Sequence, residues 1–168
     1  MKYETDGNLQ SAFSGESQAN RRYLFFAAKA EEEGYPQIAR LFRAVAEAET
    51  VHARNHFNTM GGVGSIKDNL LAGSTGEHRE FTRMYPPFIV QAEEEKNEKA
   101  RIAFQYADKV ERIHHQHFEK ALEAIKTGQK VEDKPYFVCQ VCGNTVAGQA
   151  PDGCPVCGAA YGKFKLIE

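Results

Sequence analysis

The sequence lacks the long apolar runs and the charge bias that mark membrane, secreted and nucleic-acid-binding proteins. No apolar run approaches the roughly 20 residues that a membrane-spanning helix needs. The first residues, Met1 to Gly7, contain no apolar stretch of the kind found in signal peptides. A net charge of -2 gives no preference for nucleic acid or for anionic membranes. We therefore expect a cytoplasmic protein.

Cysteine is also scarce, and its placement argues against a disulfide-stabilised fold. The four cysteines form two Cys-x-x-Cys pairs separated by residues 143–153: Cys139, Cys142, Cys154 and Cys157. Thiolates at this spacing are typical of a tetrahedral site for a single zinc or iron ion. Gly143 and Gly158 follow the pairs, where the lack of a Cβ lets the backbone fold around the sulfurs. Because this site uses every cysteine, no disulfide framework remains.

Length and composition fit one helical domain with a small appendage. A chain of 168 residues with 42% hydrophobic residues can bury one core of ordinary size. Capping residues and helical periodicity predict four helices, over residues 8–33, 36–60, 75–95 and 97–127. Pro86 and Pro87 should kink or interrupt the third of them. We expect an all-α four-helix bundle over residues 1–133 and a small metal-binding ribbon over residues 134–168.

A Glu-x-x-His motif occurs twice, with an offset of 62 positions, at Glu49/His52 and Glu111/His114. Because an α-helix turns once in about 3.6 residues, Glu and His three positions apart project from one face and can bind the same ion. Glu16 and Glu77, each preceded by glycine, offer one further carboxylate for each copy. Two such pairs with two additional glutamates are the ligand set of ferritin-like di-iron carboxylate proteins.

The two motifs lie at positions where core residues are expected. In the second helix, Glu49 and His52 continue an apolar stripe whose earlier members are Ile38, Leu41, Phe42 and Val45. A single Glu-x-x-His is common on solvated helices, but an unpaired carboxylate on a buried stripe is strongly unfavourable. Divalent cations remove this cost directly. The duplicated motif therefore predicts a two-metal site.

An internal repeat extends beyond these ligands. Residues 30–33 and 92–95 both read Ala-Glu-Glu-Glu, again at an offset of 62. Glu16 and Glu77 are only 61 positions apart, so the second half contains one additional residue, which we place near the Pro86/Pro87 kink. The repeat predicts two pseudo-symmetric helical hairpins.

The expected linker between the hairpins covers residues 61–74. It can extend about 46–50 Å and so just span a bundle about 37 Å long. It also permits an exchange of hairpins between two protomers. The sequence does not decide between these arrangements.

The chain resembles the rubrerythrins over essentially its full length. Beside the motifs above, the resemblance is carried by Gly15-Glu16-Ser17-Gln18-Ala19, Gly76-Glu77-His78-Arg79-Glu80 and Met84-Tyr85-Pro86. It implies a ferritin-like bundle with a non-haem di-iron centre, followed by a rubredoxin-like domain with one iron held by the four cysteine thiolates. The short spacing between the cysteine pairs is similar to that of other rubrerythrins. The absence of tryptophan departs from many rubredoxin cores.

The resemblance also implies roles for single residues. Glu49 and Glu111 match bridging ligands, Glu16 and Glu77 match terminal ligands, and His114 matches the imidazole ligand of one iron. On the other iron, Glu80 and His52 are implied to alternate. Glu80 would bind when oxidation raises the charge of the metal, which keeps the site near neutrality.

Two tyrosines, Tyr23 and Tyr85, match family tyrosines near the cluster. Hydrogen bonding to ligand carboxylates and plain core packing both remain open for them. His78, His115 and His117 are expected to face solvent.

The activity that the resemblance implies is a peroxidase that reduces hydrogen peroxide to water in defence against oxidative stress. Electrons would come from a rubredoxin or an NAD(P)H-dependent reductase and pass singly through the tetrathiolate iron. The short hinge before the ribbon suggests, as in the family, delivery to the di-iron site of a neighbouring subunit in a head-to-tail homodimer.

Two other functions fit the residues. A ferroxidase or iron-storage bundle would use dioxygen and form mineral, although an appended electron-transfer domain argues against it. A non-enzymatic metal-binding protein would carry structural zinc in the ribbon.

Overall fold

The computed structural model describes residues 2–167, with side chains from Glu4 onward. By their contacts, the residues form two compact units, Met1–Gly64 and Ser65–Glu168. The expected boundary between residues 133 and 134 divides the chain differently and stays a prediction; its outer ends, Met1 and Glu168, lie outside the described residues. Within residues 2–167, no helix is long and apolar enough to cross a membrane.

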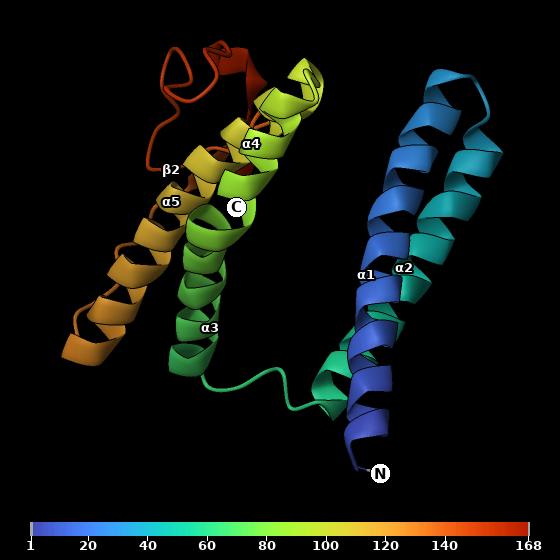
Figure 1. Cartoon of the computed structure of the whole chain (residues 1–168), viewed down its shortest axis with the longest axis horizontal. Coiled ribbons are helices and arrows are strands. Elements are labelled where there is room, and N and C mark those ends of the chain that lie inside the picture. The colour runs from blue at the N-terminus through green and yellow to red at the C-terminus, as the bar shows by residue number, and fades with distance from the viewer. Residues whose placement is uncertain (1, 168) are drawn as a thin grey trace. The chain divides into compact units, whose positions relative to one another are not determined.

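The first unit is a hairpin of two long helices, α1 (Lys2–Glu32) and α2 (Pro36–Thr59) (Figure 1). α1 begins six residues earlier than predicted, whereas α2 begins at Pro36 as predicted, because the fixed φ of proline suits a first helical turn. The turn between them requires Gly34, whose φ is 81°. Small buried residues let the two helices approach closely: Ala27, Ala30 and Ala39.

The predicted apolar stripe of α2 is only partly buried. Phe42 and Val45 are half-buried, but Ile38 and Leu41 are 46% and 61% exposed, and the buried residues of this helix are instead Ala39 and Ala46. On α1, Phe25 is 68% exposed. A two-helix hairpin can bury only one strip of each helix, so a second apolar strip remains on the surface of the unit.

The second unit begins with a helix that the sequence analysis placed too late. α3 (Ile66–Arg79) starts nine residues before the predicted position 75. Ser65 and Asp68 form a capping box: the Asp68 N–H donates to Oγ of Ser65 at 3.2 Å, and the Ser65 N–H donates to the Asp68 carboxylate at 3.3 Å. The predicted linker over residues 61–74 is therefore wrong.

The actual connection between α2 and α3 is short and consists of residues 60–65. Six residues extend at most about 20–22 Å. The 24 residues of α2 make a helix about 36 Å long. The connection cannot run the length of a helix, which argues against the crossover along a bundle, one of the two arrangements that the sequence left open.

A π-helical turn, η1 (Glu80–Met84), separates α3 from α4 (Tyr85–Glu94). A π turn contains one more residue than an α-helical turn, so η1 accommodates the additional residue of the second repeat. Pro86 and Pro87 follow directly in the first turn of α4, where their missing N–H groups cost least. The predicted interruption of this helix is confirmed.

The ribbon follows α5 (Glu98–Thr127), which begins at the Asn97 cap and ends at Gly128, as predicted. It contains an antiparallel sheet in the order β2-β1-β3 and a short 3-10 helix, η2 (Tyr161–Lys163). The strands are β1 (Tyr136–Cys139), β2 (Thr145–Ala147) and β3 (Phe164–Ile167). β2 contacts α5, so the ribbon and this helix belong to one unit.

Replacing Ser65 with alanine should destabilise the first turn of α3 by about 1 kcal/mol, because a capping side chain is lost. Ser11→Ala, at an exposed position inside α1, is the control and should have little effect. Amide hydrogen exchange of residues 66–70 measures the difference. Unchanged protection in the Ser65 variant would contradict the capping assignment.

Candidate metal centres

Three predicted ligands come together in the first unit. Glu16 on α1 lies beside Glu49 and His52 on α2, and one ligand atom of each lies within 4.8 Å of the other two. Nδ1 of His52 is 2.9 Å from Oε2 of Glu49, because residues three positions apart share a helix face. The side chain of Glu49 is 14% exposed and that of His52 is 54% exposed. The imidazole therefore lies at the open edge of the group.

The second unit repeats this arrangement. Glu77 on α3 lies beside Glu111 and His114 on α5, again with one ligand atom of each within 4.8 Å of the other two. Nδ1 of His114 is 2.7 Å from Oε2 of Glu111. The side chain of His114 is 26% exposed, half the value of its counterpart His52. We call the group of Glu16, Glu49 and His52 the first half-site and the group of Glu77, Glu111 and His114 the second half-site.

Burial and closely placed negative charges together shift the pKa values of the second half-site. Burial and hydrogen bonding with Glu111 raise the pKa of Glu77 to about 7. Hydrogen bonding to Glu111 likewise raises the pKa of His114. In both cases a proton relieves the repulsion between closely placed carboxylates. A divalent cation would relieve it more strongly, so these residues fit a metal site.

Glu80 and Tyr85 lie next to the second half-site. Burial, followed by the negative charge of Glu111, raises the pKa of Glu80. Burial, followed by the charge of Glu80, raises the pKa of Tyr85. Glu80 is not one of the three closely grouped ligands, but it is near enough to respond to their charge. Its alternation with His52 stays a prediction, because the two residues belong to different units.

Tyr23 lies in an aromatic cluster of the first unit. Its ring centroid is 6.3 Å from that of Phe26 and 6.1 Å from that of Phe42. These contacts give Tyr23 a packing role. The predicted role of its hydroxyl group at the metal site stays a prediction.

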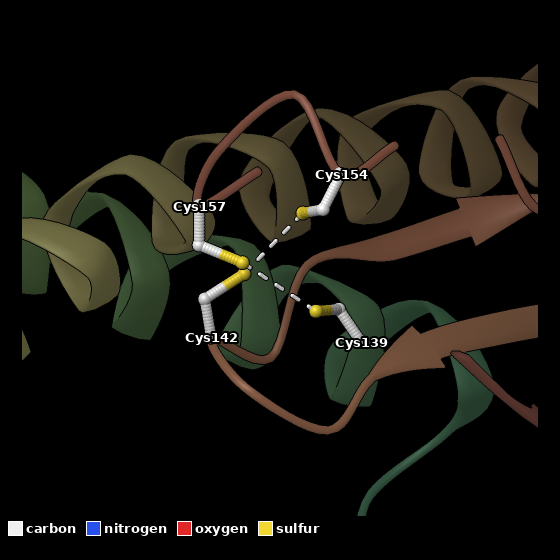
Figure 2. A group of neighbouring side chains, drawn as sticks. All are labelled: Cys139, Cys142, Cys154 and Cys157. Atoms are coloured by element: carbon white, nitrogen blue, oxygen red, sulfur yellow. Dashed lines mark hydrogen bonds between the residues drawn. The ribbon is translucent and has the colours of Figure 1, made fainter. Parts of the chain in front are cut away.

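The four cysteines point toward one another from the two knuckles of the ribbon (Figure 2). Sγ of Cys139 is 3.7 Å from Sγ of Cys157, and Sγ of Cys142 is 3.6 Å from Sγ of Cys154. Bonds of about 2.3 Å to a tetrahedral ion would place neighbouring sulfurs about 3.8 Å apart. The cluster therefore has the dimensions of a site for one tetrahedral metal ion.

Glycines form the predicted knuckles. Gly143 and Gly158 have φ angles of 83° and 76°. Their N–H groups donate to the carbonyl oxygens of Cys139 and Cys154, both at 2.8 Å. Residues with a Cβ rarely adopt this left-handed conformation, which confirms the reason for glycine at both positions.

Hydrogen-bond donors also surround the sulfur of Cys154. Burial alone would raise the pKa of Cys154, but donation from the backbone N–H groups of Cys157 and Val156 lowers it to about 7. Nδ2 of Asn144, a side chain only 1% exposed, donates to the same sulfur at 3.7 Å. Such donors favour the thiolate, the form that binds metal. Sequence reasoning missed Asn144, because nothing in its local sequence distinguishes it from a turn residue.

Three contacts near the second half-site were also missed. His115 and His117 do not face solvent as predicted: the Nδ1 of His115 is 3.1 Å from the carbonyl oxygen of Ser74, and the Nε2 of His117 is 2.9 Å from that of Thr145. Oγ1 of Thr145 is 3.0 Å from Nε2 of His114. The contact of His115 depends on the packing of α3 against α5, and the two contacts of Thr145 depend on the docking of β2 against α5, which no sequence periodicity signals.

A profile of the family described as "Rubrerythrin" matches residues 7–122, and one described as "Rubrerythrin, rubredoxin-like domain" matches residues 137–165. The chain belongs to the rubrerythrin family. It is 34% identical to Rubrerythrin-2 of Clostridium acetobutylicum, over 95% of this chain and 94% of that protein. It is also 34% identical to a rubrerythrin of Nitratidesulfovibrio vulgaris, over 97% of this chain and 94% of that protein.

Solved structures of nigerythrin are similar to this chain. One, titled as the mixed-valence state, has a TM-score of 0.58 and 34% identity, over 97% of this chain and 86% of that one. Another, titled as the fully reduced, all-ferrous state, has a TM-score of 0.59 and 33% identity over the same shares. The fold class is thereby confirmed as a ferritin-like helical protein with a rubredoxin-like domain.

The cofactors expected from the sequence agree with the family and with the geometry. The carboxylate and histidine groups are suited to a di-iron centre, and the four cysteines to one rubredoxin-type iron. The assignment of each ligand to a particular iron stays a prediction.

Removing the metal with a chelator should lower the temperature of thermal unfolding, since a ligand that binds only the folded state stabilises it. Restoring iron at a hundredfold excess over its Kd should raise the free energy of unfolding by about 2.7 kcal/mol for each site filled. Glu111→Gln should lose the part of this shift that comes from the carboxylate site and keep the part that comes from the four cysteines. Glu94→Gln, exposed at the end of α4, is the control. Equal shifts in the two variants would contradict the assignment of Glu111 as a ligand.

Proposed function

We propose that this protein is a peroxidase that reduces hydrogen peroxide to water at a di-iron centre, with electrons delivered through the four-cysteine iron site. One observation carries the proposal: the second half-site and the four-cysteine cluster lie in one compact unit, joined through Thr145 and His114. An electron-transfer site next to a carboxylate site favours redox turnover over metal storage. When bound, the iron pair supplies the two electrons that convert peroxide and two protons into two water molecules.

In this proposal the two half-sites together hold the iron pair. Each contributes a Glu-x-x-His pair and one further glutamate. Glu49 and Glu111 would bridge the ions, and Glu16 and Glu77 would each bind one of them. This division follows the repeat, because equivalent residues of the two halves receive equivalent roles.

The two histidines differ in how firmly they are held, and this supports an exchange that involves only one of them. The Nε2 of His114 contacts Thr145, and its Nδ1 contacts Glu111. Among the described residues of its own unit, His52 has one polar partner, Glu49, and its side chain is twice as exposed. His52 can therefore move at lower cost than His114, which fits a site in which Glu80 replaces His52 on oxidation.

The short connection between α2 and α3 suggests which chain completes each iron site. Ferritin-like bundles contain one long crossover between their two hairpins. Residues 60–65 are too short for that crossover. We infer that each site combines the first half-site of one protomer with the second half-site of another, in a homodimer with exchanged hairpins. The exposed apolar strip around Phe25 and Leu41 is the kind of surface that such an exchange would bury.

The external electron donor would be a rubredoxin or an NAD(P)H-dependent reductase. Two measurements distinguish the proposal from its alternatives. Iron rather than zinc in the ribbon, seen as visible thiolate-to-iron absorption, separates it from a non-enzymatic zinc protein. Steady consumption of peroxide without mineral formation separates it from a ferroxidase.

Cys142→Ser should abolish turnover driven by an external reductant while sparing single-turnover oxidation of the prereduced di-iron site. The reason is that the substitution removes one thiolate of the electron-transfer site and leaves both half-sites intact. Val141→Ser, at an exposed position between the two cysteines, is the matched control. Steady-state and stopped-flow assays with peroxide separate the two activities. Undiminished steady-state activity in the Cys142 variant would refute the relay.

Glu80→Ala should retain both irons in the reduced state, keep His52 bound after oxidation, and turn over peroxide more slowly. The extra carboxylate is needed most when oxidation raises the charge of the iron pair. Glu94→Ala, on the exposed surface of α4, is the matched control. Crystal structures of the reduced and oxidised wild-type protein provide the direct comparison. Identical ligands in both states would rule out the alternation of Glu80 and His52.

A further inference from the structure

The four-cysteine ribbon lies on the helix that carries the second half-site of the same chain. After α5 ends at Thr127, residues 128–135 lead to β1, and β2 contacts α5. The helix rises about 20 Å between His114 and Thr127. Eight extended residues reach about 26–29 Å, so the chain is long enough to bring its own ribbon back to its own half-site.

Thr145 forms the central polar contact between the ribbon and α5. Its hydroxyl group donates to the carbonyl oxygen of Gly143 at 3.1 Å. A hydroxyl group has one proton to donate, so toward Nε2 of His114, at 3.0 Å, it acts as an acceptor. The carbonyl oxygen of Thr145 accepts from Nε2–H of His117 at 2.9 Å. Two histidines on one face of α5 thus hold a single residue of the ribbon.

This contact determines which nitrogen of His114 is free to bind metal. A neutral imidazole carries one N–H. In the structure Nδ1 donates to Oε2 of Glu111 at 2.7 Å. An ion bound at Nδ1 would displace that proton and leave the remaining N–H on Nε2, bonded to Thr145. Metal-binding histidines commonly donate their other ring N–H to an acceptor that fixes the tautomer. Here the ribbon supplies the acceptor.

A cleft beside this contact is lined by residues of both the second half-site and the ribbon. It has a volume of about 450 Å³, and its walls include residues of the half-site, of α5 and of the ribbon. Glu77 and His114 line it from the half-site, and Tyr136 and Thr145 line it from the ribbon. The ribbon therefore forms part of the immediate surroundings of the second half-site.

We propose that the four-cysteine site serves the second half-site of its own chain, and that Thr145 is the positioning residue that joins the two. This inference rests on the proposed function and deepens it. The connecting atoms run from Cys142 to the carbonyl group of Gly143, then through the hydroxyl group of Thr145 to the ring of His114. With iron bound at both sites, the four cysteines would hold the ferrous ion that gives up one electron and becomes ferric, and Glu77, Glu111 and His114 would hold the ferric ion that accepts it and becomes ferrous. The resemblance to the family implied delivery to a neighbouring subunit instead.

Mixed dimers separate delivery within a chain from delivery between chains. In the trans sample, one protomer carries Cys142→Ser and the other carries His114→Ala. In the cis sample, one protomer carries both substitutions and the other is wild type. The two samples, purified through two different affinity tags, contain the same substitutions. Each is loaded with iron, reduced and exposed to peroxide while the visible absorption of the ribbon iron is followed.

Delivery within the chain predicts that the intact ribbon of the trans sample stays reduced, whereas the intact ribbon of the cis sample is reoxidised as in the wild type. The opposite pattern would overturn the inference. A wild-type homodimer whose ribbon is not reoxidised by peroxide would contradict the proposed function itself, so the two failures are distinguishable.

A second measurement does not depend on turnover. In the full-length protein loaded with zinc, ¹⁵N NMR of His114 reports which ring nitrogen carries the proton. The wild type and Thr145→Ser should show a protected Nε2–H, whereas in Thr145→Val this proton should exchange with water about tenfold faster. Thr127→Val, which removes a hydroxyl group bonded to the carbonyl oxygens of Glu123 and Ala124 in its own helix, is the control and should match the wild type. An unchanged His114 in Thr145→Val would show that Thr145 does not position it.

Discussion

The need to compensate closely spaced carboxylates is the constraint on which this structure depends. Each half-site places two partly buried glutamates and one histidine on adjacent helices. Without a cation these groups repel, and burial together with the neighbouring carboxylate of Glu111 raises the pKa of Glu77. Apolar residues at the same positions would make each hairpin more stable and would remove the site. The helices therefore hold an arrangement that is unfavourable until metal binds.

The two kinds of metal centre solve the charge problem differently. The half-sites bring carboxylates together across two helices and depend on metal to neutralise them. The ribbon instead directs N–H donors at its sulfurs, from the knuckle backbone and from Asn144, so part of the thiolate charge is stabilised by the protein itself. Rigid strands and tight turns suit the stabilisation of sulfur by N–H donors, because backbone N–H groups are fixed there. Long helices suit the grouping of carboxylates around a metal, because side chains three residues apart meet on one face.

The sequence was sufficient to predict the elements whose positions are determined by neighbouring residues. The positions of α2 and α5, the interruption before Pro86 and the glycine knuckles follow from helical spacing, capping and backbone conformation. The start of α3 was misplaced, because glycines and serines suggested a linker and obscured the Ser65/Asp68 capping box. The grouping within each half-site followed from the duplicated motif. The contact of Thr145 with His114 could not be predicted, because it joins residues 31 positions apart through the docking of a strand on a helix.

The π turn at Glu80–Met84 lets the side chains of α3 and those of α4 face different directions around the helix axis. One residue corresponds to about 100° of rotation around a helix. The extra residue therefore sets the angular phase of α4 independently of that of α3. The face that presents Glu77 to Glu111 and the face that packs Tyr85 against Phe104 need not follow one continuous helical stripe. A helix with this change of angle can direct ligands toward a metal at one end and aromatic side chains toward their neighbours at the other. A regular α-helix of the same length could do both only if all these side chains shared one continuous face.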